Sequence, residues 1–223
     1  MGFDFSYMLD LMPILLKYLG TTMAMAVWGL LFALVLSVTL AIIRVFKIPV
    51  LDQLSQLYIS FFRGTPLLVQ LFLMYYGLPQ VIPALVGLDA FTASVIGLTL
   101  HFASYMAESI RAAIIGIDRS QMEASLSVGM TTSQAMRRVI LPQATRVALP
   151  SLMNYFIDMI KSTSLAFTLG VAEIMAKAQM EASSSFRFFE AFLAVALIYW
   201  GVVVILTRVQ IWAEAKLNKA YVR

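Results

Sequence analysis

The sequence predicts an all-α polytopic membrane protein with about five transmembrane helices. Of its 223 residues, 61% are hydrophobic and only 13% are charged, and the mean hydropathy is +0.87. A soluble domain of this length carries roughly twice that charged fraction. Long uncharged runs recur along the chain, and a helix needs about 20 apolar residues to cross a bilayer. The excess apolar surface is therefore expected to face lipid.

Composition also excludes several classes of function. The chain has no cysteine, so it can form neither a disulfide framework nor a thiolate metal site. Its single histidine has no cluster of carboxylates near it in the sequence, so no metal site is predicted. The net charge of +4 is explained by basic residues at the cytoplasmic ends of membrane helices. We therefore expect the lipid bilayer, and no nucleic acid, as the partner of this charge.

Five runs predict the transmembrane helices in order. The first run ends at Arg44 and Lys47. Asp4 and Asp10 precede every basic residue of the chain, which argues against a cleaved signal peptide. The helix of the second run is expected to begin earlier, near Leu51. Charged residues end the third run and interrupt the fourth and the fifth. The five runs are 18–43, 64–88, 90–107, 147–172 and 188–207.

The basic residues predict the orientation. With the N-terminus outside and the C-terminus inside, the cytoplasmic segments hold Arg44, Lys47, Arg111, Arg119, Arg137, Arg138, Arg146, Arg208, Lys216, Lys219 and Arg223, and the external segments hold Lys17, Lys177 and Arg187. The positive-inside rule favours this arrangement. The predicted organisation is an external N-terminal segment (1–17), one transmembrane domain (18–212) with a cytoplasmic loop at about 117–145, and a cytoplasmic tail (213–223).

The cytoplasmic loop is predicted to contain two short helices. Ser120 and Glu123 have the spacing of a capping box, in which each side chain accepts from a free backbone N–H at the helix start. Gly129 then stands where a helix end favours a left-handed residue. Thr131 begins a second helix, which is expected to run to about Leu141 and to end before Pro142.

This loop carries a family resemblance. Glu123-Ala124-Ser125, Gly129 and the run 139–142 resemble the EAA loop of ABC importer permeases, with Ser125 and Val139 replacing the usual alanine and isoleucine. Further segments resemble the polar amino acid branch of that family, namely 62–67, 75–79, 105–112 and 161–165. The resemblance implies a permease subunit of a binding-protein-dependent importer for polar amino acids in the bacterial cytoplasmic (inner) membrane.

The same resemblance implies the partners. The loop would act as a coupling-helix pair that docks on a cytoplasmic ATPase, through Glu123, Ala124, Gly129, Leu141 and Pro142; Glu123 could instead cap its helix. The chain contains no G-x-x-x-x-G-K-[ST] phosphate loop and is not expected to be an enzyme. ATP and Mg²⁺ would bind a dimer of the ATPase subunit. The other implied partners are a second permease copy or homologue and an external amino-acid-binding protein.

Two helix interruptions predict a substrate site, because polar groups at membrane depth usually mark a pathway. In Gly64-Thr65-Pro66, Thr65 is expected to be the N-cap and Pro66 the first residue of an outer half-helix, whose positive end would attract a carboxylate. The fourth run carries polar groups at helical spacing. The predicted substrate contacts are Thr65, Leu67, Asn154, Asp158, Ser162 and Thr163.

Other polar residues are expected to be structural. Arg63 is predicted to pair with Glu108, while Arg111 and Lys161 are further structural charges. His101 is expected to be a hydrogen-bonded residue of the helix bundle, although ion pairs without any ligand remain an alternative for Arg63, Asp158 and Lys161.

The substrate expectation rests on two neutral positions. Relatives that carry cationic amino acids typically have acidic residues at the positions of Tyr155 and Ser162, which favours cystine or another neutral polar amino acid here. The main alternative function is an ion-coupled secondary transporter, with Asp158 and Glu108 carrying protons. A membrane-embedded enzyme and a membrane scaffold without transport are further alternatives.

Overall fold

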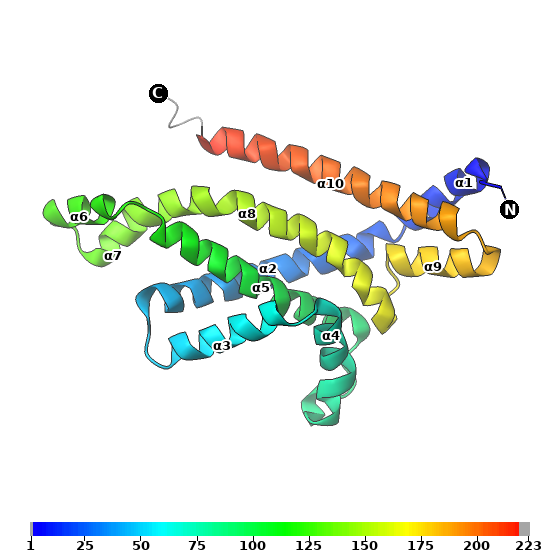
Figure 1. Ribbon diagram of the computed structural model, residues 1–223, viewed down its shortest axis with the longest axis horizontal. Helices are drawn as coiled ribbons and strands as arrows, with labels where there is room; N and C mark the ends of the chain where they lie inside the picture. Colours follow the sequence, from blue (N-terminus) through cyan, green and yellow to red (C-terminus); the bar gives the residue numbers. More distant parts are fainter. Residues whose placement is uncertain (1, 219–223) are drawn as a thin grey trace.

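Four long helices run along the length of the molecule (Figure 1). The computed structural model describes residues 2–218, and every regular element within that range is helical. The long helices are α2 (Leu19–Phe46), α5 (Ala90–Ile115), α8 (Leu141–Ser162) and α10 (Phe188–Asn218). Helix α5 packs against both α2 and α8, and α10 packs against α8.

Shorter elements occupy the two ends and one side of this bundle (Figure 1). At one end lie α6 (Arg119–Ser127) and α7 (Thr132–Ala135), and at the other α1 (Phe5–Leu16) and α9 (Ile174–Ser185). On one side α3 (Leu51–Gly64) leads to α4 (Leu67–Phe72). The remaining turns are the π-helices η1 (Leu73–Gly77) and η4 (Met136–Ile140) and the 3₁₀-helices η2 (Leu78–Gln80), η3 (Pro83–Leu85) and η5 (Thr163–Leu169).

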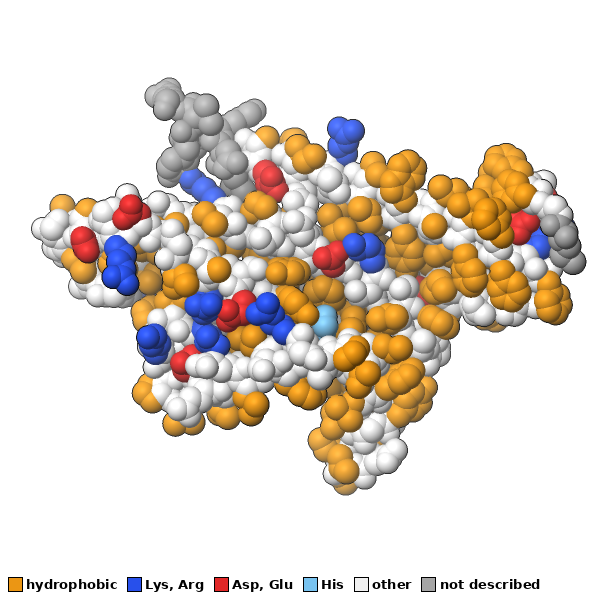
Figure 2. Space-filling model, viewed as in Figure 1, with side chains coloured by type: hydrophobic (Ala, Val, Ile, Leu, Met, Phe, Trp, Pro, Cys, Tyr) orange, Lys and Arg blue, Asp and Glu red, His pale blue; other side chains and the backbone are white. Residues whose placement is uncertain are grey.

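Three helices within residues 2–218, namely α2, α5 and α10, are long and apolar enough to cross a membrane. Two bent pairs bring the number to five if each forms one span. One pair is α3 with the segment 67–80, bent by 110°, and the other is the segment 132–169 with α9, bent by 53°. Apolar side chains cover much of the surface in Figure 2, and Val35 on α2 is 70% exposed. Such a surface suits lipid rather than water.

Helices α2 and α5 approach closely because small residues line their contact. Ala26 and Ala33 of α2 and Ala103 of α5 are fully buried in the largest core cluster. A Cβ atom on Gly29 would lie 2.9 Å from the sulfur of Met159, so only glycine fits there without a shift. Small residues at helix contacts are typical of membrane bundles, in which close packing replaces the hydrophobic effect.

The N-terminal segment is part of the packed structure. Leu11 and Leu15 of α1 are buried against α9 and α10. Asp4 caps α1 and forms an ion pair of 2.6 Å with Arg187, and its backbone N–H donates to the Glu190 carboxylate at 3.0 Å. At the other end of the chain α10 continues to Asn218, so the expected tail 213–223 begins as helix, and its residues 219–223 lie outside the described range.

One helix is longer than its uncharged run, and one expected helix end is wrong. Helix α5 continues past Glu108 to Ile115, because the charge of Glu108 is compensated by Arg111 one turn further on. The helix after Thr131 does not end before Pro142, since η4 leads directly into α8. Proline is tolerated in the first turn of a helix, where its missing N–H has no intrahelical partner to lose.

Candidate functional site

The chain turns sharply at Thr65 and Pro66, between α3 and α4. Thr65 is extended, and its hydroxyl donates back to the Phe61 carbonyl at 2.8 Å, so it ends α3. The expected N-cap role of Thr65 is therefore wrong, and Pro66 takes the N-cap position instead of the first helical one. The physical reason is that a residue before proline is driven out of the helical region.

Buried Gln70 holds this break together. Its Nε2 lies 2.9 Å from the Phe62 carbonyl, 3.0 Å from the Thr65 carbonyl and 2.8 Å from the Thr65 hydroxyl. Carbonyls at a helix end lack a backbone partner, and the amide of Gln70 supplies one. Gln70 was not among the predicted site residues, because a single glutamine in an apolar run gives no signal of its own.

Gln70 also sets the tautomer of His101. The Gln70 Oε1 lies 2.9 Å from His101 Nδ1, and a carbonyl oxygen can only accept, so Nδ1 carries the proton. The expectation that His101 is hydrogen-bonded within the bundle is confirmed by this contact. The histidine, pale blue in Figure 2, lies on a face that also carries Lys, Arg, Asp and Glu side chains.

Arg63 stacks on an aromatic ring instead of forming the predicted ion pair. Its guanidinium lies 5.3 Å from the centre of the Tyr105 ring. Glu108, the expected partner, is bound by Arg111 at 2.8 Å and by Arg44 at 3.9 Å. The prediction of a pair between Arg63 and Glu108 is wrong, because Arg111 lies on the same helix and two of its nitrogens bond to both carboxylate oxygens.

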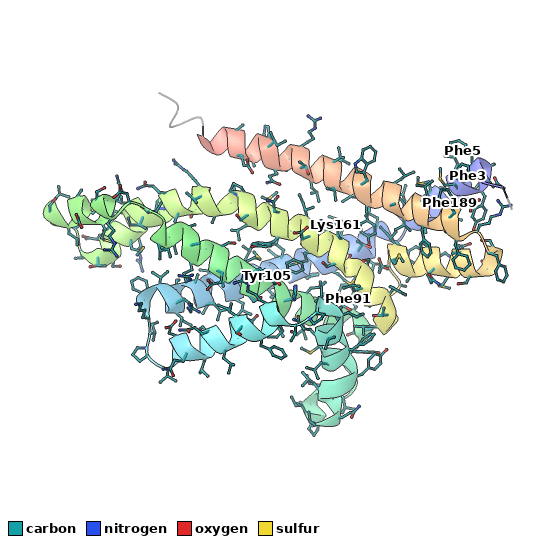
Figure 3. The ribbon with its side chains drawn as sticks, in the orientation of Figure 1. Phe3, Phe5, Phe91, Tyr105, Lys161 and Phe189 are labelled. Atoms are coloured by element: carbon teal, nitrogen blue, oxygen red, sulfur yellow. The ribbon has the colours of Figure 1, made fainter. Side chains whose placement is uncertain are left out.

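Aromatic residues extend this face from α5 to α8. The ring of Tyr105, labelled in Figure 3, lies 6.0 Å from the ring of Tyr155 on α8. The Tyr155 hydroxyl is 3.1 Å from the Ser109 hydroxyl. One turn further along α8, Asp158 pairs with Lys161, also labelled in Figure 3, at 2.6 Å. About half of each of these two charged side chains is exposed.

The predicted substrate residues fall into three groups. Asn154 and Asp158 are exposed and Ser162 is half-buried, and their spacing of four residues places them on one side of α8. Thr65 and Leu67 lie at the α3–α4 break, where Leu67 is buried. Thr163 is set apart from both groups, because its side chain is fully buried and its hydroxyl donates to the Ile160 carbonyl at 2.7 Å.

A buried carboxylate at the other chain break was missed by sequence reasoning. Glu173 is the N-cap of α9, where its side chain accepts from the Ala176 N–H at 2.8 Å. Its second oxygen lies 3.3 Å from the Tyr199 hydroxyl of α10 and 3.5 Å from the Thr22 hydroxyl of α2. One residue thus joins three helices. The signal available was an acidic residue just after an apolar run, at the start of a second helix.

The segment that the sequence predicts to couple to an ATPase, called the coupling segment below, comprises α6, the turn at Gly129 and α7. The expected capping box of Ser120 and Glu123 is wrong, because Asp118 is the N-cap and accepts from the Ser120 N–H at 2.8 Å. This hydrogen bond lowers the pKa of the Asp118 carboxyl. The expected left-handed Gly129 is confirmed by its φ of +85°, and the second helix begins with a complete capping box from Thr131.

This segment presents a polar and apolar surface. Glu123 and Ala124 are exposed, and within the described residues Glu123 forms no hydrogen bond or ion pair, so it does not cap its helix. Leu126 is 45% exposed and Val128 is 74% exposed. Apolar side chains exposed to this extent beside charged ones are typical of a protein-binding surface.

Comparison with known proteins identifies the family. The profile described as "Binding-protein-dependent transport system inner membrane component" matches residues 29–219. The chain belongs to this family. A probable amino-acid ABC transporter permease protein, PatM of Vibrio harveyi, is 91% identical over the full length of both chains. The L-cystine transport system permease protein TcyL of Bacillus subtilis (strain 168) is 39% identical over 100% of this chain and 95% of its own.

A solved structure shares the fold of this binding-protein-dependent permease. It is described as an amino acid ABC transporter with histidines, and it is 34% identical with a TM-score of 0.90 over 97% of this chain and 100% of its own. The present chain is accordingly a multi-pass inner-membrane permease subunit of an amino acid ABC importer. It is not itself catalytic, ATP binds the ATPase partner, and a binding protein is the other partner that the family implies.

Proposed function

We propose that this permease carries a neutral polar amino acid, with L-cystine as the first candidate, along the face formed by α3, the α3–α4 break, α5 and α8. The observation that supports the proposal is the exposed pair Asp158–Lys161 on a helix of the bundle. Charged groups at membrane depth are costly against lipid, so this side of α8 borders water or another subunit. The proposed contacting residues are Thr65, Leu67, Asn154, Asp158 and Ser162, while Thr163 is left out because its side chain is fully buried.

Charge supports a neutral substrate. Asp158 is paired with Lys161 at 2.6 Å, so this carboxylate is not free to bind a cationic side chain. Tyr155 and Ser162 add no charge to the same helix. The relative named as an L-cystine permease points to cystine as the first substrate to test.

The proposed assembly follows from the two exposed surfaces. A second permease copy or a homologue would cover the polar face of α8, and the ATPase would dock on Glu123, Ala124, Gly129, Leu141 and Pro142. The N-terminal segment would be external and the C-terminus cytoplasmic, which places α6 and α7 on the side of the ATPase. ATP binding would then move the docked segment and open the pathway to the binding protein.

Uptake of labelled amino acids tests this function. Cells with and without this gene receive L-cystine, L-cysteine, L-glutamine and L-serine, each with the partner ATPase active or inactivated by substitution. We expect one of these amino acids to enter only when both the gene and an active ATPase are present. Uptake that survives loss of ATP hydrolysis would instead favour the ion-coupled secondary transporter.

Two substitutions test the pathway. Ser162→Ala and Thr65→Val each remove a hydroxyl with little change in side-chain volume, and we expect uptake to fall about tenfold, as for the loss of one hydrogen bond. Thr39→Val is the matched control, because the Thr39 hydroxyl is exposed on α2 and bonds only to its own helix. Normal uptake by both variants in an assembled complex would show that the pathway lies elsewhere.

A further inference from the structure

Arg63 carries a positive charge to which no carboxylate of the described residues binds directly. The charge of Arg63 acts on Glu108 beyond ion-pair distance, and this carboxylate is bound by two other arginines. Asp52 pairs with Arg44 at 3.0 Å, and Glu108 pairs with Arg111 and Arg44. Arg44 and Arg111 thus hold both of these carboxylates. Within the described residues Arg63 has no carboxylate at ion-pair distance, and its one specific contact is the Tyr105 ring.

The position of Arg63 makes this charge costly. It lies 12 residues after the start of α3 at Leu51, about 18 Å along the helix at 1.5 Å per residue. In the proposed orientation α3 enters the membrane near Leu51, and because the hydrocarbon layer of a bilayer is about 30 Å thick, this distance reaches well into it. The side chain is nevertheless exposed on the polar face. A guanidinium at such depth is normally paired or functional.

We propose that Arg63 binds the α-carboxylate of the transported amino acid, with the Tyr105 ring as the platform that holds the guanidinium in place. The inference rests on the proposed function and adds the group that recognises the substrate backbone. A guanidinium matches a carboxylate with two parallel hydrogen bonds, and it can stack on an aromatic ring at the same time.

Neighbouring contacts place this site on the proposed pathway. Arg63 directly precedes the α3–α4 break, and Tyr105 lies between His101, at 5.1 Å between ring centres, and Tyr155 on α8. Helix α4 has only six residues, and Thr65 ends α3 instead of capping α4. The sequence predicted that the positive end of an outer half-helix would bind the carboxylate. In the proposed site the Arg63 side chain, one turn earlier, binds it instead.

The test is direct binding to the purified permease–ATPase complex without the binding protein. The probes are labelled L-cystine, L-glutamine and L-serine, each compared with its α-carboxamide, which lacks the negative charge. We expect the wild-type complex to bind one of the amino acids about 10- to 100-fold more tightly than its amide, as for a charge-assisted pair. Arg63→Gln should abolish this preference, and Lys17→Gln, which removes an exposed charge elsewhere, should leave it intact.

Two further variants separate recognition from folding. Arg63→Lys keeps the charge but loses the planar fork, and Tyr105→Leu removes the platform, so both should retain a reduced preference for the carboxylate. Assembly with the ATPase and basal ATP hydrolysis report whether each variant is folded. An unchanged ratio of amino acid to amide binding in assembled Arg63→Gln would overturn the inference. Failure of the proposed function would appear separately, as wild-type uptake that does not require the ATPase.

Discussion

At the scale of single residues, Gln70 shows how one side chain can decide a local geometry. The break at Pro66 leaves the carbonyls of Phe62 and Thr65 without helical partners, and the Gln70 amide satisfies both while its oxygen binds His101. Three polar groups are thus paired through one buried residue. The sequence offers the proline as a visible signal, but nothing in it points to the glutamine four residues later.

Gln70→Leu should destabilise the permease without changing its helix content. The substitution leaves two carbonyls and the His101 Nδ1–H unpaired in a buried site, at a cost of about 1–3 kcal/mol. Thermal unfolding in detergent measures the effect, with Gln80→Leu as the control because Gln80 is exposed and donates only to the Tyr76 carbonyl. Equal melting temperatures for the two variants would mean that the break is held by other contacts.

At the scale of elements, the coupling segment depends on one backbone conformation. Gly129 has φ of +85°, and its N–H donates to the Leu126 carbonyl at 3.0 Å, so α6 ends there and α7 can begin three residues later. A Cβ atom at this position would meet nothing within 4 Å. Only the backbone conformation therefore restricts the residue, and a β-branched side chain is poorly tolerated at positive φ.

Gly129→Val should weaken docking of the ATPase while the permease still inserts into the membrane. The cost of a β-branched residue in the left-handed region is about 1–3 kcal/mol, and it would alter the angle between α6 and α7. Gly129→Asn is the matched variant, because asparagine tolerates this conformation. Co-purification of the ATPase should fall for valine and largely persist for asparagine. A valine variant that binds the ATPase normally would contradict the proposed role of this turn.

At the scale of the whole molecule, the two chain breaks give the bundle its shape. Both bent pairs turn where the chain leaves a helix, at Pro66 and at Glu173, and a buried polar side chain stabilises each turn. The coupling segment lies at one end of the bundle, and α1 and α9 lie at the other (Figure 1). The proposed orientation assigns these ends to the cytoplasm and to the outside.

The absence of cysteine makes this orientation directly testable. Single-cysteine variants at Val128, on the coupling segment, and at Ser183, on α9, can be treated in intact cells with a maleimide that does not cross membranes. We expect labelling of Ser183→Cys and none of Val128→Cys, because only the first would face outward. The reverse pattern would invert the orientation, and Val35→Cys, exposed on apolar α2, is the control for a lipid-facing position.

Composition and sequence motifs predicted the fold class and the family of this protein. The sequence was sufficient to predict the apolar runs, the positive φ at Gly129 and the family. Lipid solvation adds up along a run, and glycine geometry is a local effect. The capping box at Ser120 and the pairing of Arg63 with Glu108 were wrong because equivalent partners compete. Asp118 lies closer to the helix start, and Arg111 lies on the same helix as Glu108.

Only the tertiary structure could decide contacts between distant segments. It decided that helix α1 (Phe5–Leu16) packs against α9 and α10, that Glu173 joins α2, α9 and α10, and that Arg63 stacks on Tyr105. The physical reason is that burial and pairing of a polar group depend on which helices meet, and that arrangement is not encoded in any one stretch of residues. The sequence determined what each segment is, and packing determined which polar and charged groups meet.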